Sequence, residues 1–337
     1  MGHLRTSRWR KPDAHGHLAR CSAGNPWLSR PIWQRAFRIH AEADFARGPL
    51  YGNRGRGSRP MNPLWVIASV TFREAARKKI LWTALVVGVG FLIVFGAGLY
   101  YQVTDFRASN MAPFLRYQIL SATLMVGLYT VDLLAVVMTI LTSVETISGE
   151  IASGTIQAIA TKPVARWHVL VGKWMGFAAM LAIYVGAMFG GTLAAGYWIG
   201  GVALQNQLRG VLLVYLECLL ALTATFLMGT WFSTLTNGVI VLGLHGLAFL
   251  GGWLEQMSGF AQGSGLVTLG VVSSLIMPSE AIWRRAAFLM QPPLAGALQF
   301  TPFANISVPS GAMVGYAGFY LLVALALAIY HFQRRDL

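Results

Sequence analysis

The sequence predicts an all-α polytopic membrane protein. Hydrophobic residues make up 55% of the 337 residues, charged residues make up 11%, and the mean hydropathy is +0.57. In a soluble globular domain, about a quarter of the residues are charged. The apolar residues also gather into stretches of roughly twenty, the length of helix that crosses the hydrocarbon core of a bilayer. We therefore expect the chain to lie in a lipid bilayer.

Residues 1–60 differ in composition from residues 61–337. They hold twelve Lys or Arg and three Asp or Glu, so they carry +9 of the net charge of +14. They contain no apolar core of about seven to fifteen residues, so no secretory signal is predicted. A segment rich in Arg and poor in acids is similar to an organellar transit peptide. The favoured interpretation is a disordered basic extension that precedes a native start at Met61. Because the basic excess belongs mostly to this extension, no nucleic-acid partner is predicted.

Six membrane-spanning helices are predicted in residues 61–337. An amphipathic lead before the first span is expected to lie as an interfacial helix among cytoplasmic headgroups, with Arg73, Arg77, Lys78 and Lys79 facing them. The expected spans are residues 80–101, 118–142, 174–200 and 211–234, then a fifth that follows a turn at Asn237 and Gly238 and ends near residue 254, and lastly residues 312–332.

Basic residues at the span ends support this number of spans. With six spans, the cations before the first, between the second and third, and after the last all face one side, as the positive-inside rule requires. Both termini are then cytoplasmic. Arg284 and Arg285, in the connection 257–310, are the exception. The same connection contains the apolar run 266–277, which is too short to span and is followed by Pro278. We predict a re-entrant or interfacial helical element there, on the extracytoplasmic face.

The polar segment 145–173 lies between the second and third predicted spans and reads ETISGEIASGTIQAIATKPVARWHVLVGK. Gly149 and Gly154 are expected to interrupt the second span, so that the chain bends into a short helix parallel to the membrane. Glu145 and Glu150 lie at this bend. They are expected to pair with basic groups of a partner or with nearby Arg and Lys side chains.

A helix is predicted to begin at Pro163, because proline fits the first turn of a helix. Arg166 and Lys173 are seven residues apart, so they would lie within roughly 20° of each other on one face, with Lys162 at its start. This cationic face predicts a docking surface for a soluble protein. The alternative is an ordinary loop whose charges only obey the positive-inside rule.

The motifs of this segment resemble the first cytoplasmic loop of type-two ABC exporter permeases, and in particular the sodium-efflux and copper-processing subgroup. They are E-x-x-x-G-T at Glu150, Gly154 and Thr155, K-P-V-x-R at 162–166, and G-K at 172–173. The ending FQRRDL at 332–337 and the long connection between the fifth and sixth spans are also similar to that family. The resemblance covers residues 61–337, which would form a six-span permease domain.

The resemblance implies a membrane subunit whose first cytoplasmic loop forms a coupling helix, seated in a groove of a separate ATPase. It also implies two ATPase copies and a second permease subunit, as a homodimer in the plasma membrane (the inner membrane). Gly186 and Gly190 permit the close helix approach that a dimer needs, although packing within one subunit explains them equally well. The residues assigned to docking are Glu145, Glu150, Gly154, Thr155, Lys162, Pro163, Arg166 and Lys173.

No nucleotide site is predicted in the chain, so it is not expected to be an enzyme. A P-loop needs G-x-x-x-x-G-K-[ST]. Around Gly172 and Lys173, Trp167 occupies the position of the first glycine and Trp174 that of the hydroxyl. We therefore expect the chain to bind no cofactor and ATP-Mg to bind the partner ATPase.

Three ionisable residues fall inside predicted spans: Asp132, Glu217 and His245. Such residues are costly in a bilayer and suggest function. They would line a polar translocation path, or Asp132 and His245 would form a proton-linked pair. Ordinary interhelical hydrogen bonding is the favoured alternative. No metal site is predicted, because the Met residues are scattered through apolar helices, as is typical of packing.

The sequence thus favours a permease subunit that couples ATP hydrolysis on another subunit to export. The alternative is a secondary transporter, or a membrane-embedded assembly factor, that works without an ATPase. A secondary transporter usually shows internal repeats, and we find none that is convincing. No residue predicts the substrate.

Overall fold

The computed structural model describes residues 63–109, 111–153, 165–261, 264–291 and 308–334, all within one compact unit, Gly52–Leu337. The predicted basic extension 1–60 lies outside the described residues. Within the described ranges the regular structure is entirely α-helical. This confirms the predicted all-α class.

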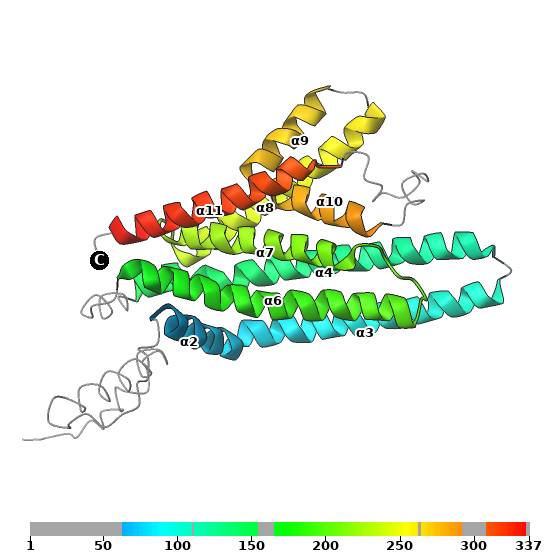
Figure 1. The fold of residues 1–337 in the computed structure, drawn as a ribbon, viewed down its shortest axis with the longest axis horizontal. Helices are drawn as coiled ribbons and strands as arrows, with labels where there is room; N and C mark the ends of the chain where they lie inside the picture. Colours follow the sequence, from blue (N-terminus) through cyan, green and yellow to red (C-terminus); the bar gives the residue numbers. More distant parts are fainter. Residues whose placement is uncertain (1–62, 110, 154–164, 262–263, 292–307, 335–337) are drawn as a thin grey trace, which may run out of the picture. The chain divides into compact units, whose positions relative to one another are not determined.

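Nine helices make up the described part of the chain (Figure 1). They are α2 (Pro63–Arg77), α3 (Lys79–Ala108), α4 (Pro113–Ala152), α6 (Arg166–Trp198), α7 (Gln207–Gly229), α8 (Thr234–Ala261), α9 (Ser264–Ile276), α10 (Ser279–Met290) and α11 (Gly311–Arg334). Six of them, namely α3, α4, α6, α7, α8 and α11, are long and apolar enough to cross a membrane. The predicted six spans are therefore found; α3, α4, α6, α8 and α11 are longer than expected, and α7 ends at Gly229, five residues before the predicted end of the fourth span.

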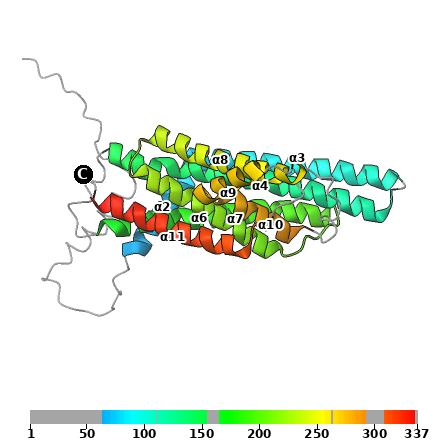
Figure 2. The same ribbon diagram turned by 90° about the horizontal axis from the view of Figure 1, so that it is seen from above.

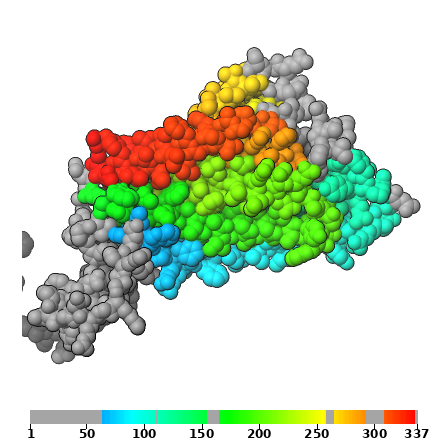
Figure 3. Space-filling model, viewed as in Figure 1, coloured from blue at the N-terminus to red at the C-terminus, as the bar shows by residue number. Residues whose placement is uncertain are grey.

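Helices α4 and α7 form the centre of the bundle. In the most apolar window of each, 61% of the residues are buried, against 6% in α3 and 22% in α11. Helix α7 packs against α4, α6, α8, α10 and α11, and the space-filling view shows α11, α7 and α6 side by side across one face (Figure 3). Because α3 is apolar but barely covered by protein, its exposed Val and Ile side chains are suited to contact with lipid.

The predicted interfacial helix before the first span is α2, which ends at Arg77. Lys78 has an extended backbone and separates α2 from α3. Helix α2 packs along the first half of α6, where two glycines of α6 make room for it. A Cβ atom on Gly172 would lie 2.8 Å from Cβ of Ile67, and one on Gly176 would lie 2.7 Å from the carbonyl oxygen of Ala68. Gly172 therefore serves helix packing in this structure.

Two predicted breaks are wrong. Helix α4 continues through Gly149 to Ala152, because a single glycine costs a helix only about 1 kcal/mol and the packed α4 side chains extend past it to Ile151. Gly154 lies outside the described residues. Asn237 and Gly238 do not turn the chain, since the turn is at residues 230–233 and both lie in α8.

Helix α9 corresponds to the helical element predicted over 266–277, and α10, which was not predicted, follows it after Pro278. They meet at an angle of 103° around Met277 and Pro278. Helix α10 packs against α7, between α8 and α11 (Figure 2). The Tyr316 hydroxyl of α11 donates to the Leu275 carbonyl oxygen at 2.6 Å, which holds the end of α9 beside α11.

Candidate functional site

One end of the bundle collects most of the charged residues singled out in the sequence. Helices α3 and α6 begin there, and α4 and α11 end there (Figures 1 and 2). The turn between α7 and α8 lies at the same end, because the Trp231 and His331 rings are in contact, with centroids 4.7 Å apart. The basic residues of this end are Arg73, Arg77, Lys78, Lys79, Arg166, Lys173 and Arg334. We call it the charged end.

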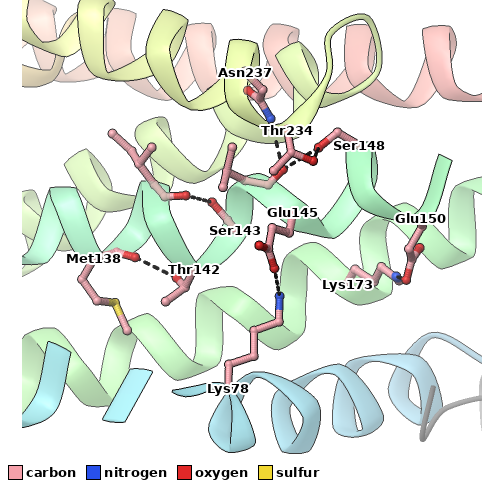
Figure 4. Close-up of polar contacts among 12 residues, drawn as sticks. Lys78, Met138, Thr142, Ser143, Glu145, Ser148, Glu150, Lys173, Thr234 and Asn237 are labelled. Atoms are coloured by element: carbon pink, nitrogen blue, oxygen red, sulfur yellow. Dashed lines mark hydrogen bonds and ion pairs between the residues drawn. The ribbon is translucent and has the colours of Figure 1, made fainter. Parts of the chain in front are cut away.

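Both carboxylates predicted for docking pair with lysines of the same chain (Figure 4). Glu145 Oε2 of α4 lies 3.9 Å from Nζ of Lys78, at the junction of α2 and α3. Glu150 of α4 forms an ion pair with Lys173 of α6. The Glu145 side chain is 54% exposed, whereas Glu150 and Lys173 are largely buried. Of these two carboxylates, Glu145 is therefore the one accessible to a partner.

The predicted cationic face is only partly present. Helix α6 begins at Arg166, and Arg166 is half-buried, with Ala165 before it exposed. Lys173, two turns later, is 5% exposed and directed at Glu150. The other residues predicted for docking, Gly154, Thr155, Lys162 and Pro163, lie outside the described residues, as does the expected coupling helix.

A seam of hydroxyl groups joins α4 to α7 and α8 at the charged end (Figure 4). The Ser143 and Thr225 hydroxyls are 2.8 Å apart, and those of Ser148 and Thr234 are 3.0 Å apart. Asn237 Nδ2 donates to the Thr225 carbonyl oxygen at 3.0 Å. This seam was not predicted, although Ser and Thr recur along the last turns of α4, a pattern that indicates contacts between helices in a bilayer.

Deeper in the bundle, three carboxyl groups from three helices come together. They belong to Asp132 of α4, Glu217 of α7 and Glu280 of α10, which are 4%, 0% and 5% exposed. Electrostatic interactions join Glu217 to both of the others. Although Asp132 lies within reach of Glu217, neither carboxyl oxygen of Glu217 has a partner with hydrogen-bond geometry among the described residues. We call these three residues the acidic cluster.

The two remaining polar pairs lie between α8 and α10. His245 Nδ1 is 3.1 Å from the Ser279 hydroxyl. Arg284 Nη2 donates to Glu255 Oε2 at 2.8 Å, and Arg284 is 2% exposed. The structure therefore brings Asp132 and Glu217 together and places His245 beside Ser279. Sequence reasoning missed Glu255 and Glu280, and took Arg284 for an exception to the charge rule although it is an internal ion-pair partner.

In the part of the chain that the structure describes, no three or more His, Cys, Asp or Glu side chains are arranged to hold a metal ion. The acidic cluster therefore differs from a metal centre in geometry, although it has suitable ligand types. What the cluster can do is to accept protons or to attract a positively charged group.

Comparison with known proteins gives one finding that covers nearly all of the described helices. A family model described as "ABC-2 family transporter protein" matches residues 65–337. The match begins inside α2 and extends beyond α11. Comparison with the curated proteins gives no match.

Proposed function

The chain belongs to the ABC-2 family of transporter proteins, and we propose that it couples ATP hydrolysis on a separate ATPase subunit to the export of a substrate. It is a multi-pass membrane subunit of an ABC-type transporter. In the proposed complex, ATP-Mg binds the ATPase, and this chain converts the closure of the ATPase into movement of its helices.

The observation that carries the coupling proposal is the length of α4 and α6 at the charged end. Lys78, at the start of α3, lies level with Glu145 because the two side chains pair. Helix α4 continues for seven further residues, 146–152, which at 1.5 Å per residue is about 10 Å beyond that level. Helix α6 begins at the same end. Helices α4 and α6 therefore both reach past the start of α3 at the charged end, where Ile147 and Ser148 of α4 remain buried, and this end is proposed to face the ATPase.

The ion pairs at the charged end would make the connection between the docking surface and the membrane-spanning helices rigid. The ion pair of Glu150 with Lys173 ties α4 to α6, and the hydroxyl seam ties α4 to α7 and α8. A force applied to the connection between α4 and α6 would then move four helices together rather than bend one. Rigid-body movement of packed elements is a common means of transmitting a conformational change.

Co-purification with an ATPase tests the docking proposal. The tagged chain would be co-expressed with each ABC ATPase of the source genome that lacks its own membrane domain. We expect one of them to co-purify, and its yield to fall at least several-fold with Arg166→Glu and with Glu145→Lys, because Glu145 is exposed and Arg166 is half-buried at the charged end. Undiminished co-purification of both variants would refute docking at this end.

A charge exchange provides the matched control. Glu150→Lys combined with Lys173→Glu preserves the ion pair between α4 and α6 in reverse. Because both side chains are largely buried, we expect this double variant to retain the ATPase. A loss equal to that of Arg166→Glu would show that Glu150 or Lys173 contacts the partner directly.

Export, a homodimer and an inner (plasma) membrane with cytoplasmic termini complete the proposal. In inside-out vesicles, the charged end would face the medium and would bind added ATPase. Inside-out vesicles that bind no added ATPase, when right-side-out vesicles do, would contradict this orientation. Cross-linking of single cysteines at Gly186 and Gly190 tests whether a second subunit contacts α6, because a Cβ atom at either position meets no other helix of the described residues within 4 Å.

A further inference from the structure

The acidic cluster is poorly compensated by the protein itself. Arg284 acts electrostatically on Glu280, but it is already ion-paired with Glu255. Asp132 Oδ1 and both carboxyl oxygens of Glu217 have no hydrogen-bond partner among the described residues. Uncompensated carboxylates are expensive inside a membrane. A positive charge from outside the chain, whether a proton or a larger cation, is needed to offset them.

Aromatic rings surround the same place. The Tyr129 ring centroid lies 5.3 Å from that of Trp283 and 6.2 Å from that of Phe249. The Phe249 ring lies in turn 6.2 Å from Trp253. Tyr129 interacts electrostatically with all three carboxyl groups of the acidic cluster. The rings and the carboxyl groups therefore belong to one site, formed by α4, α7, α8 and α10.

A carboxyl group and an aromatic ring occur close together in the sequence on each of two helices. Tyr129 and Asp132 are three residues apart on α4, and Glu280 and Trp283 are three residues apart on α10. Residues at this spacing lie on the same face of a helix. Each helix therefore presents one carboxyl group beside one large ring. On α8, Gly252 leaves room for the Glu280 side chain, because a Cβ on Gly252 would lie 2.6 Å from Cγ of Glu280.

Carboxylates beside aromatic faces are the chemistry that recognises organic cations. The face of an aromatic ring carries negative potential and attracts ammonium groups, the more strongly when water is excluded. A metal ion would need ligands arranged around one point, and the described residues show no such arrangement. Protons alone would make no use of the rings.

We propose that Asp132, Glu217 and Glu280, together with the rings of Tyr129 and Trp283, bind the cationic group of a hydrophobic organic substrate. This rests on the proposed function, because it names the substrate class of the same transporter. The buried position of Glu217 implies that the cation reaches the site when α10 or α8 moves relative to α7.

Binding of a matched cation and neutral compound tests the proposal. The cation is radiolabelled methyltriphenylphosphonium, and the neutral competitor is triphenylphosphine oxide, which has nearly the same shape. The purified full chain in zwitterionic nanodiscs would be compared with empty nanodiscs. We expect specific binding of the cation and little competition by the oxide. Absence of specific binding, or equal competition by the oxide, overturns the proposal.

Variants locate the bound cation. Glu217→Gln is expected to weaken binding about tenfold, the effect of losing roughly 1.4 kcal/mol. Trp283→Leu is expected to weaken it about threefold, as the loss of one cation–π contact would. Asp105→Asn removes an exposed carboxylate at the end of α3 and is the matched control, with unchanged binding. Glu280→Gln serves as a second acidic variant in case Glu217→Gln does not fold.

The outcome is separable from that of the docking proposal. Binding is measured without any ATPase, and Glu217→Gln should still co-purify with the ATPase, since Glu217 lies within the bundle. Unchanged cation binding in folded Glu217→Gln and Glu280→Gln overturns the cation site and leaves docking untouched. Conversely, loss of docking in Arg166→Glu does not alter the expected cation binding.

Discussion

The charged end and the acidic cluster both contain glutamates on packed helices, yet their surroundings are opposite. At the charged end, Glu145 and Glu150 each face a lysine from another part of the chain. In the acidic cluster, Glu217 faces the carboxyl groups of Asp132 and Glu280. The first arrangement satisfies its charges within the protein, whereas the second leaves them to be satisfied by something else.

This difference indicates that the charged end stabilises the arrangement of the helices, whereas the acidic cluster is suited to binding a ligand. A paired carboxylate that joins two helices stabilises one arrangement of them, and its removal leaves the partner lysine without compensation. An unpaired buried carboxylate stabilises nothing by itself and is costly to keep. Its presence in the middle of α7, where an apolar residue would pack at lower cost, indicates a role in binding. Substitutions in the two regions should therefore change stability in opposite directions.

The largest effect on stability is expected from Lys173→Met. This change leaves Glu150 in a mostly buried place without its ion-pair partner, and such losses typically cost about 3 kcal/mol or more. The free energy of unfolding, measured by SDS titration in mixed micelles, should fall by about this amount. The double variant Glu150→Gln with Lys173→Met removes both charges and should recover most of the loss. A single variant as stable as the wild type would mean that the pair does not support the charged end.

Helix packing at the charged end gives the second effect. Leucine at Gly176 would collide with the backbone of α2, because even a Cβ there lies 2.7 Å from the Ala68 carbonyl oxygen. Overpacking of this kind costs about 1–3 kcal/mol. Gly98→Ala on α3 is the control, since a Cβ atom there meets no other helix of the described residues within 4 Å, and it should be neutral or stabilising by up to about 1 kcal/mol. Equal unfolding free energies for the two variants would show that α2 is not held by this contact.

The sequence predicted the fold class and the six spans because hydrophobicity and length are local properties of each segment. It predicted the short helical element over 266–277 for the same reason, but not the second helix that follows Pro278 at an angle of 103°. It did not predict where the helices end. Gly149 suggested a break, but a local preference of about 1 kcal/mol is outweighed by the packing of α4. Asn237 suggested a turn, but its side-chain Nδ2 donates inside the bundle, to the Thr225 carbonyl oxygen.

The candidate sites were predictable only as single residues. Asp132, Glu217 and His245 stood out because ionisable residues are rare in apolar helices. Their partners depend on which helices adjoin. One of the alternatives from the sequence paired Asp132 with His245, whereas the structure places Glu217 beside Asp132 and Ser279 beside His245. Glu280 and Arg284 were not recognised because they lie on a short helix after a proline, where charge suggested only a loop at the membrane surface.

The same substitution in the two regions tests the comparison directly. Glu150→Gln should destabilise the protein, because the buried Lys173 would lose its ion pair with Glu150. Glu217→Gln removes an unpaired carboxylate and should leave stability unchanged or raise it by up to about 1 kcal/mol. The free energy of unfolding is measured for both variants, and that of Glu150→Gln is expected to be the lower. Destabilisation of similar size by both would mean that Glu217 has an internal partner, and it would remove the reason for assigning it to a ligand.

The smallest effect concerns the hydroxyl seam. Ser143→Ala combined with Thr225→Val in a double-mutant cycle isolates the bond between α4 and α7, which is 2.8 Å long. Hydrogen bonds between helices in a bilayer average about 0.6 kcal/mol, so a coupling energy near this value is expected. Each hydroxyl also bonds to a carbonyl of its own helix, so an absent coupling would mean that those local bonds suffice. The seam would then join the helices by close packing alone, and the rigidity of the charged end would rest on the ion pairs and on the glycine contacts with α2.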